Sequence, residues 1–476
     1  MIKFGTDGWR GIVGDDFTLA AVRRCAQGTA EYLLSRAGGL AVVGYDCRFG
    51  SEVFAEEVAR VLAGNGLRTL LFDRASPTQV ASWTVIDRGA TGAIVVTASH
   101  NPYLFNGLKY KPETGSSAPA EVIAELERRI NAIEPDAVRR AAATDPLIER
   151  YDPLPAYRAQ LRRMVDVDAI RASGLRILHE CMHGSAFGYL TGLLGGGRTE
   201  VTELHGERNP FFGGVNPEPI PPNLAEALAT MRGGGFDLCV ATDGDADRVG
   251  IIDETGRFIN QLQVYALLMR YLVEVRGWRG PVVKSINMTA MADRLGERYG
   301  VPVHEVPVGF KSIAPRMMET DAVLGGEESG GYAIRGHIPE RDGILCGLFF
   351  ADMIVKEGRP LSEILRALED EVGVHAYARH DVHMPRDTYE VERRRVLETL
   401  AANAPSVIAG VAVDRVRDDD GFKFFLRDGS WVLLRASGTE ALIRVYSEAG
   451  SPEEVQSRLA ALEQIVGIQY PAPQIV

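Results

Sequence analysis

Residues 236 to 252 read FDLCVATDGDADRVGII, in which two apolar runs enclose a loop with three aspartates. Short apolar runs bounded by turn residues indicate buried strands. Asp243, Asp245 and Asp247 alternate with small residues, so an extended loop can direct all three carboxylates at one hard cation such as Mg²⁺. An EF-hand is excluded because Arg248 stands where that loop requires glycine and the flanks are not helical. The remaining alternative is a solvated acidic turn.

Apolar runs of strand length alternate with amphipathic segments along most of the chain, which predicts α/β layers with parallel or mixed sheets. The predicted strands are 40–44, 69–72, 93–96, 175–178, 236–241 and 281–283, and the predicted helices are 51–63, with Ser51 as N-cap, 223–231 and 264–275. Candidate boundaries are the polar stretch 142–155 and the turn 254–256. The C-terminal part predicts a compact α+β domain with helices 389–400 and 452–465 and strands near Val411, 422–426 and 431–434.

Composition limits the classes of protein that the chain can belong to. With 476 residues, of which 46% are hydrophobic, the chain has room for about three domains. The net charge of -12 argues against a nucleic-acid-binding or membrane-binding protein, but it leaves anionic small molecules as ligands. Five scattered cysteines without a C-x-x-C pair indicate reduced thiols. We find no signal peptide or membrane span and therefore expect a cytoplasmic protein.

The segment HECMHG at 179–184 fits the zinc-peptidase pattern H-E-x-x-H letter for letter. That pattern requires a helix, which places both histidines on one face, whereas a strand separates them by about 13 Å. Because an apolar run precedes His179 and Gly184 closes the segment, we expect a strand that ends in a glycine turn. We therefore do not expect a zinc peptidase.

Three further loops carry polar groups, and each has a plain structural alternative. TASHNP at 97–102 places Ser99 after a strand, in a loop that lacks the glycines of an esterase elbow. Taken alone, the segment is better explained as a simple Ser/Asn turn, and His100 is not expected to face Ser99 if the segment is extended. GGEESGG at 325–331 offers groups for sugar hydroxyls or is a polar hairpin. RASGTE at 435–440 offers a phosphate cradle or is an ordinary loop.

Together with FGTDGWRG at 4–11, these loops in this order resemble the α-D-phosphohexomutase superfamily of phosphoglucomutases, phosphomannomutases and phosphoglucosamine mutases. The resemblance covers essentially the whole chain. It implies four domains in a heart shape, of which three are similar mixed α/β domains and the last is α+β. The expected domains are 1–148 with the phosphoserine loop, 149–254 with the Mg²⁺ loop, 255–370 with the sugar loop and 371–476 with the phosphate loop.

The resemblance also assigns roles to individual residues. Ser99 would be the phosphoserine, and its phosphate would bind Mg²⁺ together with Asp243, Asp245 and Asp247. Residues placed around the reacting phosphate are Arg10, His100, Lys109 and Arg248, of which His100 and Lys109 are candidates for acid/base assistance. The substrate-binding residues would be Lys311, Glu327 and Ser329 for the sugar, and Arg435, Ser437, Gly438 and Thr439 for the phosphate that is not transferred.

The implied reaction interconverts hexose 1-phosphate and hexose 6-phosphate through a 1,6-bisphosphate, with glucose 1,6-bisphosphate as activator. Gly331 and Ala441 depart from residues usual in parts of the family, whereas GHIPERDG at 336–343 is similar to its phosphoglucomutase branches. Glucose is therefore the expected sugar, with phosphomannomutase and phosphoglucosamine mutase as alternatives. The rival classes are a metal-dependent sugar phosphatase and a non-catalytic sugar-phosphate binder. The only partner expected is a phosphosugar, bound by a monomer or homodimer.

Overall fold

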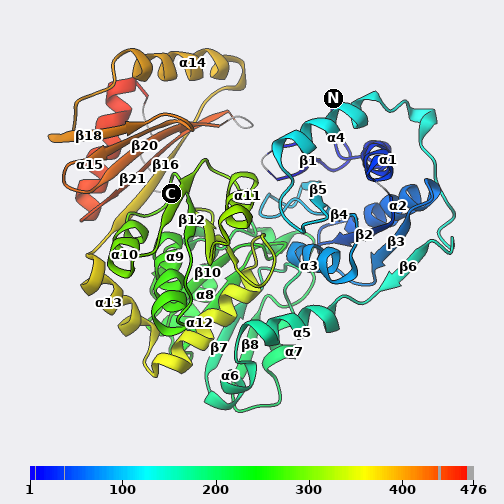
Figure 1. Cartoon of the computed structure of the whole chain (residues 1–476), viewed down its shortest axis with the longest axis horizontal. Helices are drawn as coiled ribbons and strands as arrows, with labels where there is room; N and C mark the ends of the chain where they lie inside the picture. The colour runs from blue at the N-terminus through cyan, green and yellow to red at the C-terminus, as the bar shows by residue number, and fades with distance from the viewer. Residues whose placement is uncertain (6, 37, 438–440, 469–476) are drawn as a thin grey trace. The chain divides into compact units, whose positions relative to one another are not determined.

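The computed structural model describes all residues except 6, 37, 438–440 and 469–476. Contacts divide the chain into two compact units. The first comprises Met1–Val283 and Gly309–Ile364, and the second comprises Lys284–Val308 and Leu365–Val476. Figure 1 shows helices covering the sheets in both units. The fold is therefore built of α/β layers, as predicted.

The first sheet of the first unit is mixed and six-stranded, with the order β1-β5-β4-β2-β3-β6. Its strands are β1 (Trp9–Ile12), β2 (Leu40–Tyr45), β3 (Arg68–Phe72), β4 (Gly92–Val96), β5 (Phe105–Pro112) and β6 (Ile148–Tyr151). Its helices are α1 (Leu19–Ser35), α2 (Ser51–Gly64), α3 (Thr78–Arg88) and α4 (Ala120–Ala132), with a 3₁₀ turn η1 (Pro135–Ala137). β2, β3, β4 and β6 pair in parallel, whereas β5 is antiparallel to β4 and β1.

Two details of the first sheet differ from the sequence-based prediction. Ser51 does not cap α2, because Gly50 takes the N-cap position with φ 71° and Ser51 Oγ donates to Asp46 Oδ1 at 2.8 Å. The polar stretch 142–155 contains the edge strand β6, which pairs with β3. Local composition indicated a linker there because β6 is short and half exposed.

The second sheet has the order β11-β10-β9-β7-β8. Its strands are β7 (Arg176–Glu180), β8 (Glu200–Leu204), β9 (Leu238–Thr242), β10 (Val249–Asp253) and β11 (Phe258–Ile259). Its helices are α5 (Leu154–Met164), α6 (Val167–Ser173), α7 (Tyr189–Leu194) and α8 (Ala225–Arg232), with 3₁₀ turns η2 (Phe212–Gly214) and η3 (Pro221–Asn223). The HECMHG segment begins on β7, which confirms that it is not a zinc-peptidase helix.

The first unit continues through α9 (Gln261–Arg270), the π-helical turn η4 (Tyr271–Val275), α11 (Phe310–Thr320), β14 (Leu324–Glu327), β15 (Gly331–Ile334) and α12 (Gly343–Glu357). β14 and β15 form an antiparallel hairpin that pairs Glu327 with Gly331. The chain passes between the units within β12 (Val282–Ser285), between Val308 and Gly309, and within α13 (Leu361–Val372).

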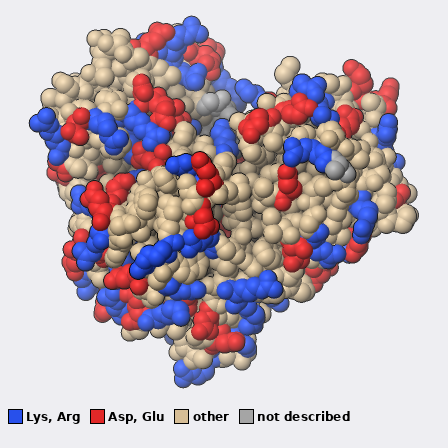
Figure 2. All heavy atoms as spheres, viewed as in Figure 1, with Lys and Arg blue, Asp and Glu red and all other residues tan. Residues whose placement is uncertain are grey.

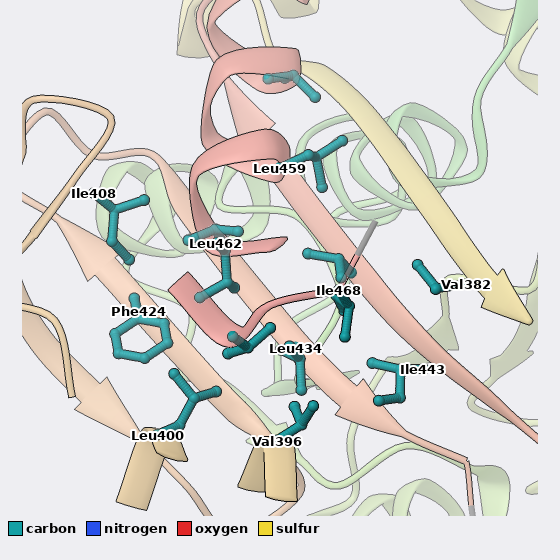
Figure 3. Close-up of a cluster of buried hydrophobic side chains, with 14 of the residues drawn as sticks. Val382, Val396, Leu400, Ile408, Phe424, Leu434, Ile443, Leu459, Leu462 and Ile468 are labelled. Carbon is teal, nitrogen blue, oxygen red and sulfur yellow. The ribbon is translucent and has the colours of Figure 1, made fainter. Parts of the chain in front are cut away.

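The second unit contains α10 (Met291–Tyr299), β13 (Val303–Val306) and an antiparallel sheet with the order β16-β21-β20-β19-β18-β17. The sheet strands are β16 (Ala376–His383), β17 (Val407–Ile408), β18 (Val411–Arg417), β19 (Phe422–Leu426), β20 (Trp431–Ala436) and β21 (Leu442–Ala449). Helices α14 (Arg386–Ala402) and α15 (Pro452–Val466) belong to the same domain. Figure 3 shows apolar side chains such as Val396, Phe424 and Leu462 filling its core. This confirms the α+β prediction.

Three observations concern the cysteines, the helices and the surface charges of the protein. All five cysteines are buried and unpaired, as predicted. Among the described residues, no helix combines the length and the apolar character needed to cross a bilayer. On the face in view, Figure 2 shows basic and acidic side chains interspersed.

Candidate active site

The aspartate loop connects the antiparallel strands β9 and β10, which confirms that its flanks are strands. Asp243, Asp245 and Asp247 are fully buried, and one carboxylate oxygen of each lies within 4.8 Å of the others. Ala246 adopts φ 58°, which turns the loop back between the strands. The alternation of acidic and small residues therefore does converge the three carboxylates.

The three aspartates fit a hard divalent cation. The Oδ1 atoms of Asp245 and Asp247 are buried and have no hydrogen-bond partner among the described residues. Burial, together with the charges of Asp245 and Asp247, raises the pKa of Asp243 well above its usual range. Clustered buried carboxylates need positive charge, and carboxylate oxygens are the ligands that Mg²⁺ prefers. The loop can therefore hold a metal ion.

Ser99 follows β4 and points at this loop. Its Oγ donates to Asp243 Oδ2 at 2.8 Å, and its backbone N–H donates to Thr97 Oγ1 at 2.9 Å. Ser99 adopts the left-handed φ of 52°, which is uncommon for a residue other than glycine and is typical of strained functional turns. The expectation that His100 faces away is wrong, because the segment is not extended: His100 Nδ1 lies 3.4 Å from Ser99 Oγ.

Arg48 holds the Ser99 loop in this conformation. Its fully buried guanidinium donates to the carbonyls of Ser99, Asn101, Pro102 and Phe105 and pairs with Asp46 at 3.1 Å. Sequence reasoning missed Arg48. The signal available was its position just beyond β2, the parallel neighbour of β4, since such strands end at the same sheet edge.

Lys109 lies on β5 and connects Asp7, near the N-terminus, with the aspartate loop. Its Nζ lies 2.8 Å from Asp247, 2.9 Å from Asp245 and 2.9 Å from Asp7. Burial by itself would lower the pKa of Lys109, but the three carboxylates raise it above its ordinary value. Lys109 is therefore a firmly charged ammonium group. For Asp245, burial would raise the pKa, but Lys109 and the Thr78 hydroxyl lower it.

Arg341 is a second cation at this site that sequence reasoning missed. Its guanidinium lies 3.0 Å from Asp247 and 3.0 Å from Glu327, and it also pairs with Asp7. The Glu327 carboxylate accepts a further hydrogen bond from Ser329 Oγ at 2.7 Å. Arg341 therefore connects the aspartate loop with the predicted sugar loop. The available signal was the segment GHIPERDG, which contains Arg341 and resembles the phosphoglucomutase branches.

Two of the remaining predicted cations of the first unit, Arg10 and Arg248, lie near His100 and near each other. Arg10 donates to Asn101 Oδ1 in the serine loop, and Arg248 pairs with Glu218 at 3.1 Å. Burial lowers the pKa of His100 well below its usual range, and the charges of Arg248 and Arg10 lower it further. Lys311 lies in the first turn of α11 and is exposed.

The predicted phosphate loop lies in the second unit. Arg435, near the end of β20, pairs through Nε with Asp420 Oδ1 at 2.9 Å. The Ser437 backbone N–H donates to Leu442 O at 3.0 Å. Gly438 and Thr439 lie outside the described residues, so their prediction stands untested.

A serine that donates to one of three clustered, buried aspartates, at the strand ends of an α/β fold, is placed where it can act as a nucleophile beside a metal ion. The sequence matches all four domains of the phosphoglucomutase/phosphomannomutase family: alpha/beta/alpha domains I, II and III over 1–137, 155–256 and 260–372, and the C-terminal domain over 390–465. The chain belongs to this family, within the α-D-phosphohexomutase superfamily, and is a mutase-type isomerase.

Three relatives span nearly the whole chain. A Methanopyrus kandleri protein named probable phosphoglucosamine mutase is 31% identical over 95% of both chains. A Thermococcus kodakarensis phosphoglucomutase/phosphomannomutase is 30% identical over 96% of both. A crystal structure from Thermus thermophilus, assigned as a phosphomannomutase, is 36% identical with a TM-score of 0.85, covering 98% of this chain and 99% of that one.

Proposed function

We propose that this enzyme interconverts the 1-phosphate and 6-phosphate of a hexose or hexosamine through a phosphoserine at Ser99. The observation that supports this most directly is the 2.8 Å hydrogen bond from Ser99 Oγ to Asp243, beside two further aspartates and the Lys109 ammonium. This arrangement brings together a nucleophile, a metal site and fixed positive charge, which are the requirements of phosphoryl transfer.

The reaction consists of two transfers in opposite directions. In the first, the bond between Ser99 Oγ and phosphorus breaks as the free hydroxyl of the sugar monophosphate forms a bond to the same phosphorus. The hydroxyl proton goes to a neighbouring base, Ser99 Oγ takes up a proton as it leaves phosphorus, and the product is a hexose 1,6-bisphosphate. The bisphosphate then turns over, and its other phosphoryl group returns to Ser99. Added glucose 1,6-bisphosphate would phosphorylate Ser99 by this second step and thus act as activator.

Different residues of the chain are assigned different roles in each transfer. Asp243, Asp245, Asp247 and the Ser99 phosphate would hold Mg²⁺, which supplies positive charge against the charge that develops on the phosphoryl group. His100 is neutral near pH 7, because its pKa is lowered, and it is therefore able to accept a proton 3.4 Å from Ser99 Oγ. Lys109 keeps its charge and positions the aspartates.

Sugar binding is assigned to Glu327 and Ser329, with Lys311 as a further contact. Arg341 and Ser329 hold the Glu327 carboxylate in place, so its remaining lone pairs can accept from sugar hydroxyls. Arg435, Ser437, Gly438 and Thr439 would bind the phosphate that is not transferred, and a second phosphate site distinguishes a mutase from a phosphatase. Arg10 and Arg248 are assigned to the reacting phosphate.

The preferred sugar is a separate question. The sequence favoured glucose, whereas the relatives carry the names phosphoglucosamine mutase and phosphomannomutase as well as phosphoglucomutase. These names support the alternatives at least as well as glucose. We therefore propose glucosamine, mannose and glucose phosphates as equally good candidate substrates, and the first assay should include all three.

The test is ³¹P NMR of the enzyme with Mg²⁺, a trace of glucose 1,6-bisphosphate and the 1-phosphate or 6-phosphate of each sugar. We expect the isomeric phosphate to appear, and we expect no conversion with Ser99→Ala. Ser82→Ala is the matched control, because Ser82 is also a buried serine and its Oγ has no hydrogen-bond partner among the described residues. Inorganic phosphate accumulating alone would establish a phosphatase, and bisphosphate binding without turnover would establish a binding protein.

A further inference from the structure

A second group of potential metal ligands lies on the second sheet, apart from the aspartate loop. β7 and β8 are parallel, and their register pairs His179 directly with Glu203. Cys181 follows two residues after His179, and its backbone N–H donates to Leu204 O at 3.0 Å, which continues the pairing. Residues two apart share one face of a strand, and paired residues of neighbouring strands also share a face. The three side chains therefore converge.

The distances among the ligand atoms agree with one tetrahedral ion. Cys181 Sγ lies 3.4 Å from His179 Nδ1, which lies 3.8 Å from Glu203 Oε1. One atom from each residue lies within 4.8 Å of the others. Tetrahedral Zn²⁺ with ordinary bond lengths places sulfur and nitrogen ligands about 3.5 Å apart and nitrogen and oxygen ligands about 3.4 Å apart. Small side-chain movements would complete this geometry.

Neighbouring groups hold two of the three ligands in orientation. His179 Nε2 lies 3.4 Å from Thr242 Oγ1, which leaves Nδ1 directed toward Cys181 and Glu203. Glu203 Oε1 accepts from the Gly188 backbone at 2.7 Å and from Thr191 Oγ1 at 3.0 Å. Metal ligands are typically supported in this way by outer hydrogen bonds.

The burial of the ligands also suits a metal ion. His179 and Cys181 are fully buried, whereas the Glu203 side chain keeps 18% of its surface exposed and marks a route of entry. His183, the second histidine of the HECMHG segment, is not part of the group, because its Nδ1 contacts Glu207 at 3.2 Å.

We propose that His179, Cys181 and Glu203 form a binding site for a thiophilic divalent cation, with Zn²⁺ as the chemical match. A thiolate and an imidazole select zinc over magnesium, so this site and the all-oxygen aspartate loop bind different metals. The Cys181 thiol releases its proton to solvent on binding. Because the thiol must lose its proton before the sulfur can bind zinc, zinc affinity increases with pH.

The position of the site connects it with the aspartate loop. Thr242, which faces His179, directly precedes Asp243 in the chain. Ser185, four residues after Cys181, donates from its backbone N–H to Gly244 O at 3.0 Å. Zinc would therefore fix the segment 179–185, which contacts the aspartate loop at Gly244 and the residue before it at Thr242.

The test uses the full-length protein in excess Mg²⁺, titrated with Co²⁺ as a spectroscopic substitute for Zn²⁺. We expect one equivalent to bind with a thiolate-to-cobalt charge-transfer band that Zn²⁺ abolishes. Cys181→Ser should remove the band, and Cys346→Ser, which alters another buried thiol on α12, should retain it. Glu203→Gln should weaken Zn²⁺ binding by at least about tenfold while leaving the thiolate band present.

X-ray absorption at the zinc edge tests the unmodified protein independently of any variant. We expect one sulfur ligand at about 2.3 Å together with nitrogen and oxygen ligands. A shell of oxygen alone, absence of the thiolate band, or a band that survives in Cys181→Ser would each overturn the proposal. Zinc that remains bound in Cys181→Ser but is lost in Asp245→Asn would place the ion in the aspartate loop instead.

Discussion

Gly331 offers a sharp test of how the sugar loop is joined to the aspartate loop. A Cβ at this position would lie 2.2 Å from Cδ and 2.6 Å from Cγ of Arg341. Gly331 begins β15 and does not require positive φ, so its backbone tolerates alanine and only the side chain of Arg341 stands in the way. Gly331→Ala should therefore act by displacing Arg341.

The expected loss of unfolding free energy follows from the contacts of Arg341. Its guanidinium meets four carboxylates, and three of them keep another cation: Asp7 and Asp247 retain Lys109, and Glu340 retains Lys111. Among the ion pairs of the described residues, Glu327 loses its only cation. Removing one partner of a buried pair costs about 3–5 kcal/mol. We expect about 3 kcal/mol, since one pair is lost outright.

The assay is a double-mutant cycle in urea-induced unfolding, followed by circular dichroism. Gly331→Ala and Arg341→Ala should each lower the unfolding free energy by about 3 kcal/mol. The Cβ that remains in Arg341→Ala lies 3.4 Å from the new methyl, an ordinary contact, so Gly331→Ala should cost almost nothing in that background. Equal costs of Gly331→Ala with and without Arg341 would refute the steric argument.

Three further outcomes are expected. Arg48→Lys should lower kcat by about 100-fold with little change in KM, because lysine cannot donate to all four carbonyls and the Ser99 loop would shift. Arg36→Lys, at an exposed ion pair, is the control in the same rate assay. Asp247→Asn should abolish transfer and weaken Mg²⁺ binding, as titration calorimetry would measure; unchanged affinity would contradict the metal assignment. Burial lowers the pKa of Lys423 to about 8. The unfolded chain then binds more protons between pH 8 and about 10.4, so stability should rise with pH there by about 3 kcal/mol. Lys423→Met should flatten this slope in urea unfolding.

The apolar runs predicted the core strands because their burial is a local property of the sequence. β2, β3, β4, β7 and β9 each lie within one or two residues of the predicted strand, with two-residue shifts at the end of β7 and at the start of β9. β5 was missed, although it carries Lys109. Its sequence, FNGLKYKP, contains two lysines that a local reading places in solvent. Both are buried because carboxylates from distant segments neutralise them, which no local pattern encodes.

In the candidate site, too, features set by neighbouring residues were predicted and features set by the backbone conformation or by distant residues were missed. Alternating small and acidic residues predicted the aspartate cluster, since the convergence needs only five consecutive positions. The contact between Ser99 and His100 was missed because the sequence does not show whether the Ser99 backbone is left-handed or extended. Arg48 was missed because its acceptors are backbone carbonyls, which every residue has.

The charge pairs of the site also bear on how it forms. Lys109 reaches Asp247 across 138 residues, Lys111 reaches Glu340 across 229, and Arg341 reaches Asp7 across 334. Contacts between residues so far apart in sequence offset the entropy lost on loop closure only after the sheets that carry them have formed. Each buried charge is costly until its partner arrives, so the site cannot assemble ahead of the packed first unit. Catalytic competence should therefore be the last property regained on refolding, after the core strands are protected from hydrogen exchange.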